Sequence, residues 1–241
     1  MKNLIDIHTH SVSCSHAYST IKENYDRAKE LGLYVYGISE HGYAMDAGVN
    51  KTFFKNLAVM EEKNPLLLKG MEANIVDFDG NIGEGEVIEY LDYVIASMHL
   101  NVLTPGSKKE NTKTILKALN NEKINIIGHL DDSRFPVDYK EIVSELKNSK
   151  TILELNNSSL SETSFRLGAK ENLTELLSLL AEDDRKIIIN TDSHYYKSVG
   201  DIKLAIDLIE EIKFPKELVI NFNENLLREF LKNNLNKSFD L

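Results

Sequence analysis

Most of the side chains in this sequence that could do chemistry are histidines, and they occupy one kind of position. Each of the seven histidines lies at the end of a segment typical of a β-strand or in the loop just after one. They are His8, His10, His16, His41, His99, His129 and His194. Imidazole and carboxylate groups are ligands that zinc, iron and manganese accept. This placement predicts a polynuclear metal site assembled at the ends of strands.

Two pairs of residues near opposite ends of the chain have the spacing of co-ligands. His8 and His10 close the first apolar run, and Asp192 and His194 follow the run at 186–190. Because side chains i and i+2 of an extended strand point to the same side, each pair can converge on one ion. Either pair alone also fits exposed loop residues, but the two together favour metal binding.

Glu72 interrupts the otherwise apolar segment Leu66–Ile75. Burying a carboxylate costs free energy unless the group is paired or binds a metal. A carboxylate also has two oxygens, so it can bridge two ions where an imidazole cannot. We therefore predict that Glu72 is a bridging ligand.

The remaining candidates are weaker when each is considered alone. His41, His99 and His129 each fit a hydrogen-bonded histidine at the rim of a barrel as well as a ligand. His16 lies in a loop of small residues that could fold back over the strand ends. Cys14 is expected to be an inert small side chain rather than a thiolate ligand.

The elements that must position these residues alternate along the whole chain. We expect strands at Leu4–His8, Tyr34–His41, Leu66–Ile75, Tyr93–His99, Ile124–His129, Thr151–Asn157 and Lys186–Asn190. Between them lie segments with apolar residues at spacings of three and four, which are typical of amphipathic helices. This alternation predicts βαβ units and a single closed or nearly closed parallel barrel. In such barrels the active site lies at the carboxyl ends of the strands.

Composition narrows the class of protein. The 241 residues carry a formal charge of −10, which disfavours general binding to nucleic acids. One cysteine excludes an internal disulfide and fits a reducing compartment. No signal peptide precedes the first strand, and no apolar run approaches the roughly 20 residues that span a bilayer. We expect a cytoplasmic protein with one domain over residues 1–241, comprising a barrel at about 4–231 and a fraying tail at about 232–241.

Six short motifs resemble those of the PHP (polymerase and histidinol phosphatase) superfamily, and most closely its YcdX-like bacterial phosphatases. They are Asp6-Ile7-His8-Thr9-His10, His16-Ala17-Tyr18-Ser19, Glu40-His41-Gly42, Gly70-Met71-Glu72-Ala73-Asn74, Asn156-Asn157-Ser158-Ser159 and Thr191-Asp192-Ser193-His194. The motifs occur in the family's order over nearly the whole chain. The resemblance implies a distorted (βα)7 barrel, similar to a TIM barrel, that holds three divalent metal ions. These are commonly zinc, and manganese or iron also occurs in the superfamily.

The resemblance also implies how nine ligands divide among the three ions. The first ion would be held by His8, His10, Glu72 and Asp192, the second by Glu72, His99 and His129, and the third by His16, His41 and His194. The departures from the family pattern lie beside the ligands. Glu40 stands where Asp is common, and the run after His129, residues 130–136, lacks the usual short Asn-Pro segment. These departures affect the expected substrate more than the metal binding.

Together these observations predict a metal-dependent hydrolase of phosphate esters, specifically a phosphomonoesterase acting on a small phosphorylated molecule. The nucleophile would be a metal-bound hydroxide formed from water held near Glu72, His8 and Asp192. Arg166 is the leading candidate for a phosphate clamp, because a guanidinium offers a bidentate fork. Lys170 and Arg134 are weaker candidates, and a solvated loop position explains each of the three nearly as well.

Three alternatives remain open. One is a histidinol-phosphate phosphatase, another is an exonuclease like those of polymerase-associated PHP domains, and the third is a non-catalytic regulatory protein. The acidic net charge counts against the exonuclease. The complete set of ligands counts against a degenerate regulatory protein. The family resemblance is compatible with a homo-oligomer, although no apolar stripe requires one.

Overall fold

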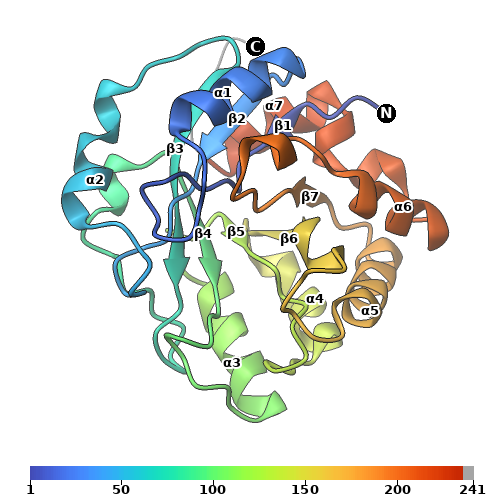
Figure 1. Cartoon of the computed structure of the whole chain (residues 1–241). Coiled ribbons are helices and arrows are strands. Elements are labelled where there is room, and N and C mark those ends of the chain that lie inside the picture. Colours follow the sequence, from blue (N-terminus) through green and yellow to red (C-terminus); the bar gives the residue numbers. More distant parts are fainter. Residues whose placement is uncertain (236–241) are drawn as a thin grey trace.

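A computed structural model describes residues 1–235 and contains one seven-stranded parallel sheet. The strands lie side by side in chain order and curve into a nearly closed barrel with helices outside it (Figure 1). Their bounds are β1 Ile5–Asp6, β2 Val35–Ile38, β3 Leu66–Asn74, β4 Tyr93–Ser97, β5 Ile126–Ile127, β6 Ile152–Asn156 and β7 Ile187–Asn190. The predicted fold class is confirmed, although several strands end before the histidine that follows them.

Seven α-helices accompany the strands in the described part of the chain. They are α1 Ile21–Glu30, α2 Lys51–Asn56, α3 Lys108–Leu119, α4 Tyr139–Glu145, α5 Ala169–Glu182, α6 Lys203–Glu211 and α7 Glu224–Asn233. Short 3₁₀ turns link several of them. None of the helices within residues 1–235 is both long enough and apolar enough to cross a bilayer.

Local sequence signals fix where the first helix begins and ends. Thr20 is its N-cap and accepts a hydrogen bond from the backbone of Glu23, whose side chain accepts one from the backbone of Thr20. This reciprocal capping box satisfies donors that the first helical turn leaves free. Gly32 follows the helix with φ of +67°, a conformation that L side chains rarely adopt. The helix is therefore confined between the first loop and β2.

The closed lower part of the barrel is filled by one large side chain. Tyr93 on β4 is buried, and its hydroxyl donates to the backbone oxygens of Ile7 and Ile38 at 2.6 and 3.0 Å. Gly37 and Gly70 make room for it, because a Cβ at either position would lie within 2.4 Å of a Tyr93 atom. Tyr93 packs there with apolar side chains of the other strands, and the cavity that holds the candidate ligands opens at the carboxyl ends of the strands.

The extended backbone continues beyond the first and last strands and joins them. Thr9 and Ser193 form a parallel bridge, and the backbone N–H of His10 donates to the oxygen of Ser193 at 2.8 Å. This contact keeps the backbone of residues 8–10 beside that of residues 192–194. The chain therefore brings the first and last predicted ligand pairs together where the barrel closes.

The expected boundary of the tail lies within an ordered element. Helix α7 continues to Asn233, and Leu231 and Leu235 are buried in the cluster that covers the lower end of the barrel. Two of the helix's apolar side chains, Leu227 and Phe230, pack in the same cluster. The expected tail therefore starts inside structured chain, and residues 236–241 lie outside the described residues.

Candidate metal centre

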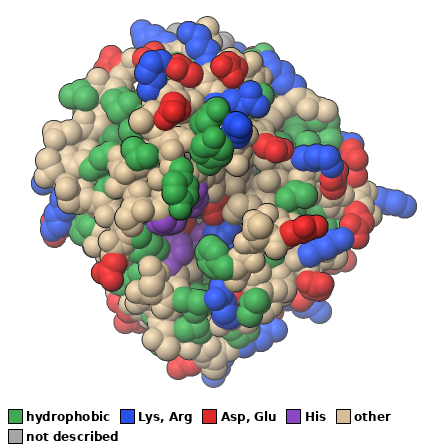
Figure 2. Space-filling view, viewed as in Figure 1, with side chains coloured by type: hydrophobic (Ala, Val, Ile, Leu, Met, Phe, Trp, Pro, Cys, Tyr) green, Lys and Arg blue, Asp and Glu red, His purple; other side chains and the backbone are tan. Residues whose placement is uncertain are grey.

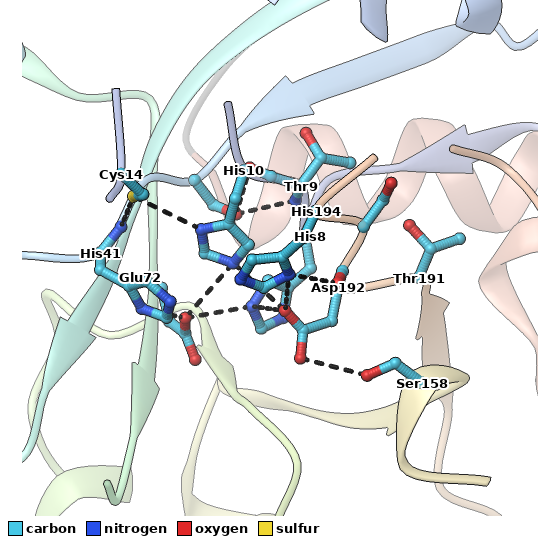
Figure 3. Close-up of polar contacts among 12 residues, drawn as sticks. His8, Thr9, His10, Cys14, His41, Glu72, Ser158, Thr191, Asp192 and His194 are labelled. Carbon is cyan, nitrogen blue, oxygen red and sulfur yellow. Dashed lines mark hydrogen bonds and ion pairs between the residues drawn. The ribbon is translucent and has the colours of Figure 1, made fainter. Parts of the chain in front are cut away.

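The predicted ligands gather at the carboxyl end of the barrel. Figure 3 shows His8, His10, His41, Glu72, Asp192 and His194 pointing toward one another from four separate parts of the chain. Each comes from a strand end or the loop after it, because the parallel sheet brings all of its carboxyl ends to one face. None of the seven histidines lies in a helix.

Four of these residues surround one small region. The Nε2 atom of His8 lies 3.3 Å from a Glu72 oxygen and 3.6 Å from Asp192 Oδ1. The Nε2 atom of His10 lies 3.5 Å from the same Glu72 oxygen and 3.2 Å from the same Asp192 oxygen. All four atoms are buried, yet none forms a hydrogen bond. Such a group would be costly to leave unpaired in a protein interior, and its donor types fit a divalent transition metal.

Glu72 faces two sets of histidines with its two oxygens. Oε1 lies 2.8 Å from His129 Nε2 and 3.2 Å from His99 Nε2. Oε2 lies 2.7 Å from His41 Nδ1 and also faces His8. The carboxylate thus separates two groups of imidazole nitrogens, as a bridge between two ions requires.

A third group forms around His16. Its Nε2 atom lies 3.3 Å from His41 Nε2 and 2.9 Å from His194 Nε2. Two nitrogens bound about 2.0–2.1 Å from one zinc ion at a tetrahedral angle lie about 3.4 Å apart, so these separations fit co-ligands. His10 also approaches this group, with ligand atoms of His10, His41 and His194 all within 4.8 Å of one another. The three groups of candidate ligands therefore lie next to one another, and His10 and His41 each face more than one of them.

The electrostatics of the centre favour a bound cation. Burial raises the pKa of Glu72, but nearby histidines, His8 first, outweigh this and hold it well below its usual value. Burial lowers the pKa of His8, yet the carboxylates of Glu154, Glu72 and Asp192 raise it well above its usual value. Burial together with neighbouring histidines lowers the pKa of His16 to about 4. The site thus holds ionised carboxylates around His8, and a metal ion would replace the proton that this negative charge attracts.

Glu154 was not among the residues selected from the sequence. It is buried on β6, and its Oε1 accepts a hydrogen bond from His8 Nδ1 at 2.7 Å. Its Oε2 accepts from the backbone N–H of His129 at 2.9 Å. The signal that identified Glu72, a carboxylate within an apolar strand, was present here too. In the same way, Asn74 Oδ1 accepts from His99 Nδ1 at 2.8 Å. These outer partners fix which imidazole nitrogen faces the centre.

Two of the candidate ligands have an unusual backbone conformation. His129 has φ of +25° and Asp192 has φ of +53°, in the left-handed region that side chains other than Gly rarely occupy. Beneath His129, Gly128 packs tightly, since a Cβ there would lie 2.5 Å from Ser97 Oγ. Such conformations persist only where surrounding contacts impose them, and they are concentrated at functional sites.

The three predicted phosphate-binding residues lie in different surroundings. Arg166 is buried beside the centre, and its Nη2 donates to Asp192 Oδ2 at 2.8 Å. Its Nη1 donates to oxygens of Asn156, Ser158 and Ser159. Arg166 is not a solvated loop arginine, which was the other interpretation of its sequence position. These hydrogen bonds hold its guanidinium inside the site.

Lys170 lies away from the cavity that would hold the phosphate. It lies on the exposed side of α5, where its Nζ pairs with Glu211 of α6 at 2.8 Å, and it does not line the cavity. Arg134 does line the cavity, but its Nε donates to Asp132 Oδ1 at 2.9 Å. The choice among three basic residues could not be made from sequence, because it depends on which way loops and helix faces turn.

Cys14 has the features of an inert thiol. It is buried, and its Sγ donates to Glu40 Oε2 at 2.7 Å. Burial first, and then the Glu40 carboxylate, raise the pKa of the Cys14 thiol far above its usual value. Glu40 also accepts from the backbone N–H of Ser11. Although His10, Cys14 and Glu40 could in principle surround an ion, the protonated thiol fits a packing role for Cys14.

A cavity of about 940 Å³ opens over the candidate centre. Its lining includes His16, His99, His129, Asp192 and His194. Figure 2 shows histidine side chains at the bottom of a hollow in this face of the molecule. The centre is therefore accessible to a small molecule from solvent.

Comparison with known proteins agrees with this geometry. The family model described as "PHP domain" matches residues 6–191. The chain belongs to the PHP domain family. A "Probable phosphatase" of Clostridium novyi (strain NT) is 37% identical over 235 residues, covering 96% of both chains. A "Probable phosphatase" of Thermoanaerobacter sp. (strain X514) is 36% identical over 236 residues, again covering 96% of both.

Solved structures show the same PHP fold. The histidinol phosphate phosphatase from Lactococcus lactis subsp. lactis, complexed with zinc, L-histidinol and phosphate, superposes with a TM-score of 0.60 at 19% identity. The match covers 89% of this chain and 95% of that one. The family match confirms the predicted superfamily, and the barrel fold is shared with a structure that contains zinc.

Proposed function

We propose that this PHP protein is a metal-dependent phosphatase that hydrolyses phosphomonoesters of small molecules. The observation that carries the proposal is a cluster of buried imidazole and carboxylate atoms that lack hydrogen bonds and adjoin an open cavity through His41 and Asp192. Nine side chains would hold three divalent ions, which we expect to be zinc, with manganese or iron as alternatives. Relatives named as probable phosphatases support the same reaction class.

The three proposed ion sites use the groups described above. His8, His10, Glu72 and Asp192 would form the first, Glu72 with His99 and His129 the second, and His16, His41 and His194 the third. The contacts of Glu72 support its place as the shared ligand, because its Oε2 faces His8 and His10 while its Oε1 faces His99 and His129. When bound, the ions would activate water and offset negative charge on the phosphoryl group.

The protein's own residues would orient the reactants around this centre. Water is the proposed nucleophile, and we expect it to be held near Glu72, His8 and Asp192. The Cys14 thiol is unsuited to attack, because it is protonated and hydrogen-bonded to Glu40. Arg166 would contribute positive charge to the phosphoryl group while keeping Asp192 in place through its 2.8 Å contact. Arg134 would be a weaker contributor, since its charge is already paired with Asp132.

The charge of the protein favours small substrates over nucleic acid. A formal charge of −10 opposes the binding of a polyanion. The cavity lining carries Asp132 and Asp201 beside its two arginines, so it offers no basic track for a phosphate backbone. These features favour a phosphomonoesterase over an exonuclease.

A substrate panel tests the proposal. The chelated protein would be reloaded separately with zinc, manganese or iron and given phosphomonoesters, a phosphodiester and single-stranded DNA. Histidinol phosphate belongs in the panel because the Lactococcus structure holds L-histidinol and phosphate. We expect release of inorganic phosphate from monoesters. Cleavage of only the diester or DNA would favour an exonuclease, and no cleavage of any compound by fully loaded protein would contradict the proposal.

A further inference from the structure

The volume of the cavity is much larger than a phosphoryl group requires. Its volume of about 940 Å³ lies near the top of the range of about 300–1,000 Å³ found for small-molecule sites. Six of the candidate ligands and Arg166 line part of it, and other side chains form the rest of its lining. The walls therefore contact whatever alcohol is attached to the phosphate.

One part of this wall is apolar although it is open to solvent. Met98, Leu100, Phe135, Phe165 and Leu204 line the cavity. Phe165 is 70% exposed and Leu100 is 44% exposed. Exposed apolar surface gathered in a hollow is typical of a ligand-binding surface. A polar alcohol would gain little from this wall.

The Phe165 ring is held close to the candidate centre. Its centroid lies 5.3 Å from the guanidinium carbon of Arg166 and 5.9 Å from that of Arg134. The backbone oxygen of Phe165 also accepts a hydrogen bond from Arg134 Nη2 at 3.0 Å. Because Arg166 also contacts Asp192, a single guanidinium separates the aromatic ring from a candidate metal ligand. A small ester can therefore reach both.

The charges of the lining disfavour a second anionic group. Its two arginines are already paired, Arg134 with Asp132 and Arg166 with Asp192. Asp201 lines the cavity and has no ion pair among residues 1–235. A carboxylate or second phosphate on the alcohol would meet this acidic side chain, and both arginines of the lining are already paired.

We propose that Phe165 and the neighbouring apolar wall form a subsite for the leaving alcohol, which binds an aromatic ring that carries no negative charge. The inference rests on the proposed phosphatase function and adds the substrate class. An aromatic ring can stack on Phe165, which lines the cavity and is largely exposed. The preferred substrates would be phosphomonoesters of arylmethyl alcohols rather than of small polar or anionic alcohols.

Benzyl phosphate and ethyl phosphate provide a matched pair of probes, because both release an alkyl alcohol. We expect the wild-type protein to have a kcat/KM at least about tenfold higher for benzyl phosphate, and Phe165→Ala to lower that ratio by about tenfold. Leu167→Ala is the control, since Leu167 is exposed in the same loop but does not line the cavity. It should leave the ratio unchanged. An unaltered ratio in Phe165→Ala, or an equal change in Leu167→Ala, would overturn the subsite.

A charged probe tests the second half of the proposal. 4-Carboxybenzyl phosphate should have a kcat/KM about tenfold below that of benzyl phosphate, and Asp201→Asn should reduce this discrimination. The Asn side chain can still accept the hydrogen bond that Asp201 receives from the Lys203 backbone. Equal rates for the two substrates in wild-type protein would contradict exclusion of an anionic ring.

Binding of benzylphosphonate separates failure of the subsite from failure of the proposed function. This compound cannot be hydrolysed, so its Kd for the zinc-loaded protein does not depend on turnover. We expect Phe165→Ala to weaken its binding by about tenfold relative to ethylphosphonate. That result without hydrolysis of any monoester would support the subsite and contradict the phosphatase proposal. Equal loss of affinity for both phosphonates would contradict the subsite alone.

Discussion

The His8 imidazole donates its Nδ1 hydrogen to the Glu154 carboxylate over 2.7 Å, and both side chains are fully buried. This contact turns His8 Nε2 toward Glu72 and Asp192. The second Glu154 oxygen accepts from the backbone of His129. One outer carboxylate therefore orients candidate ligands that follow two different strands, β1 and β5.

Glu154→Gln should weaken metal binding by about 10- to 100-fold without removing a direct ligand. Each Glu154 oxygen accepts from two donors: Oε1 from His8 and Asn190, and Oε2 from His129 and Asn156. A Gln side chain has one acceptor oxygen and one NH2 group. In either orientation its NH2 group would therefore face two hydrogen-bond donors that Glu154 now accepts from. Chelator competition measures the effect, with Glu175→Gln on the exposed face of α5 as control. Equal affinity in the two variants would contradict an orienting role.

Glu72→Gln and His16→Ala should differ in the number of ions lost. The two Glu72 oxygens face separate histidine groups, whereas His16 contacts only His41 and His194 among the candidate ligands. An amide lacks the charge needed to offset two cations. Elemental analysis after metal loading should show the loss of two ions in Glu72→Gln and one in His16→Ala. The same loss in both variants would contradict the bridge.

The three basic candidates should differ in their effects on turnover. Arg166→Ala should lower kcat/KM by about 100-fold or more, because it removes a buried charge beside the phosphoryl group and also frees Asp192. Arg134→Ala should have a smaller effect, since its charge is paired at the cavity wall. Lys170→Ala should match the wild type, because Lys170 pairs with Glu211 away from the cavity. Steady-state kinetics on one monoester would rank them. An effect of Lys170→Ala equal to that of Arg166→Ala would contradict the assignment.

Metal removal should lower thermal stability. Buried groups such as His10 Nε2 and Asp192 Oδ1 have no hydrogen-bond partner, so an ion that binds only the folded state stabilises it. Free metal at about 100 times its Kd contributes about 2.7 kcal/mol, which corresponds to a rise in Tm of about 5–10 °C for a chain of this size. Calorimetry of chelated and zinc-loaded protein measures the shift. An unchanged Tm would show that these atoms do not bind zinc.

Much of the scaffold could be predicted because it depends on local and periodic signals. The alternation of apolar strands and amphipathic helices predicted the parallel barrel, and the pair Thr20 and Glu23 is a local signal for the start of α1. The parallel topology then placed the histidines at one face. Glu72 could also be identified, because a carboxylate within an apolar strand must have a reason to be buried.

The rest of the site depends on contacts between distant segments. Arg166 meets Asp192, 26 residues away, across the ends of β6 and β7. Lys170 faces outward because the apolar side of α5 packs on the core. Glu154 carried the same sequence signal as Glu72 but lies behind the ligands. Its role follows only from its 2.7 Å contact with His8.

The central claim is that bound metal ions at this histidine and carboxylate cluster enable phosphomonoester hydrolysis. The most direct measurement is the initial rate of inorganic phosphate release from benzyl phosphate as chelated protein is titrated with zinc, with bound ions per chain measured in the same samples. We predict no release from the chelated protein and a rate that rises to its maximum as three ions bind. A full rate in the chelated protein, or no release when the sites are filled, would contradict the account.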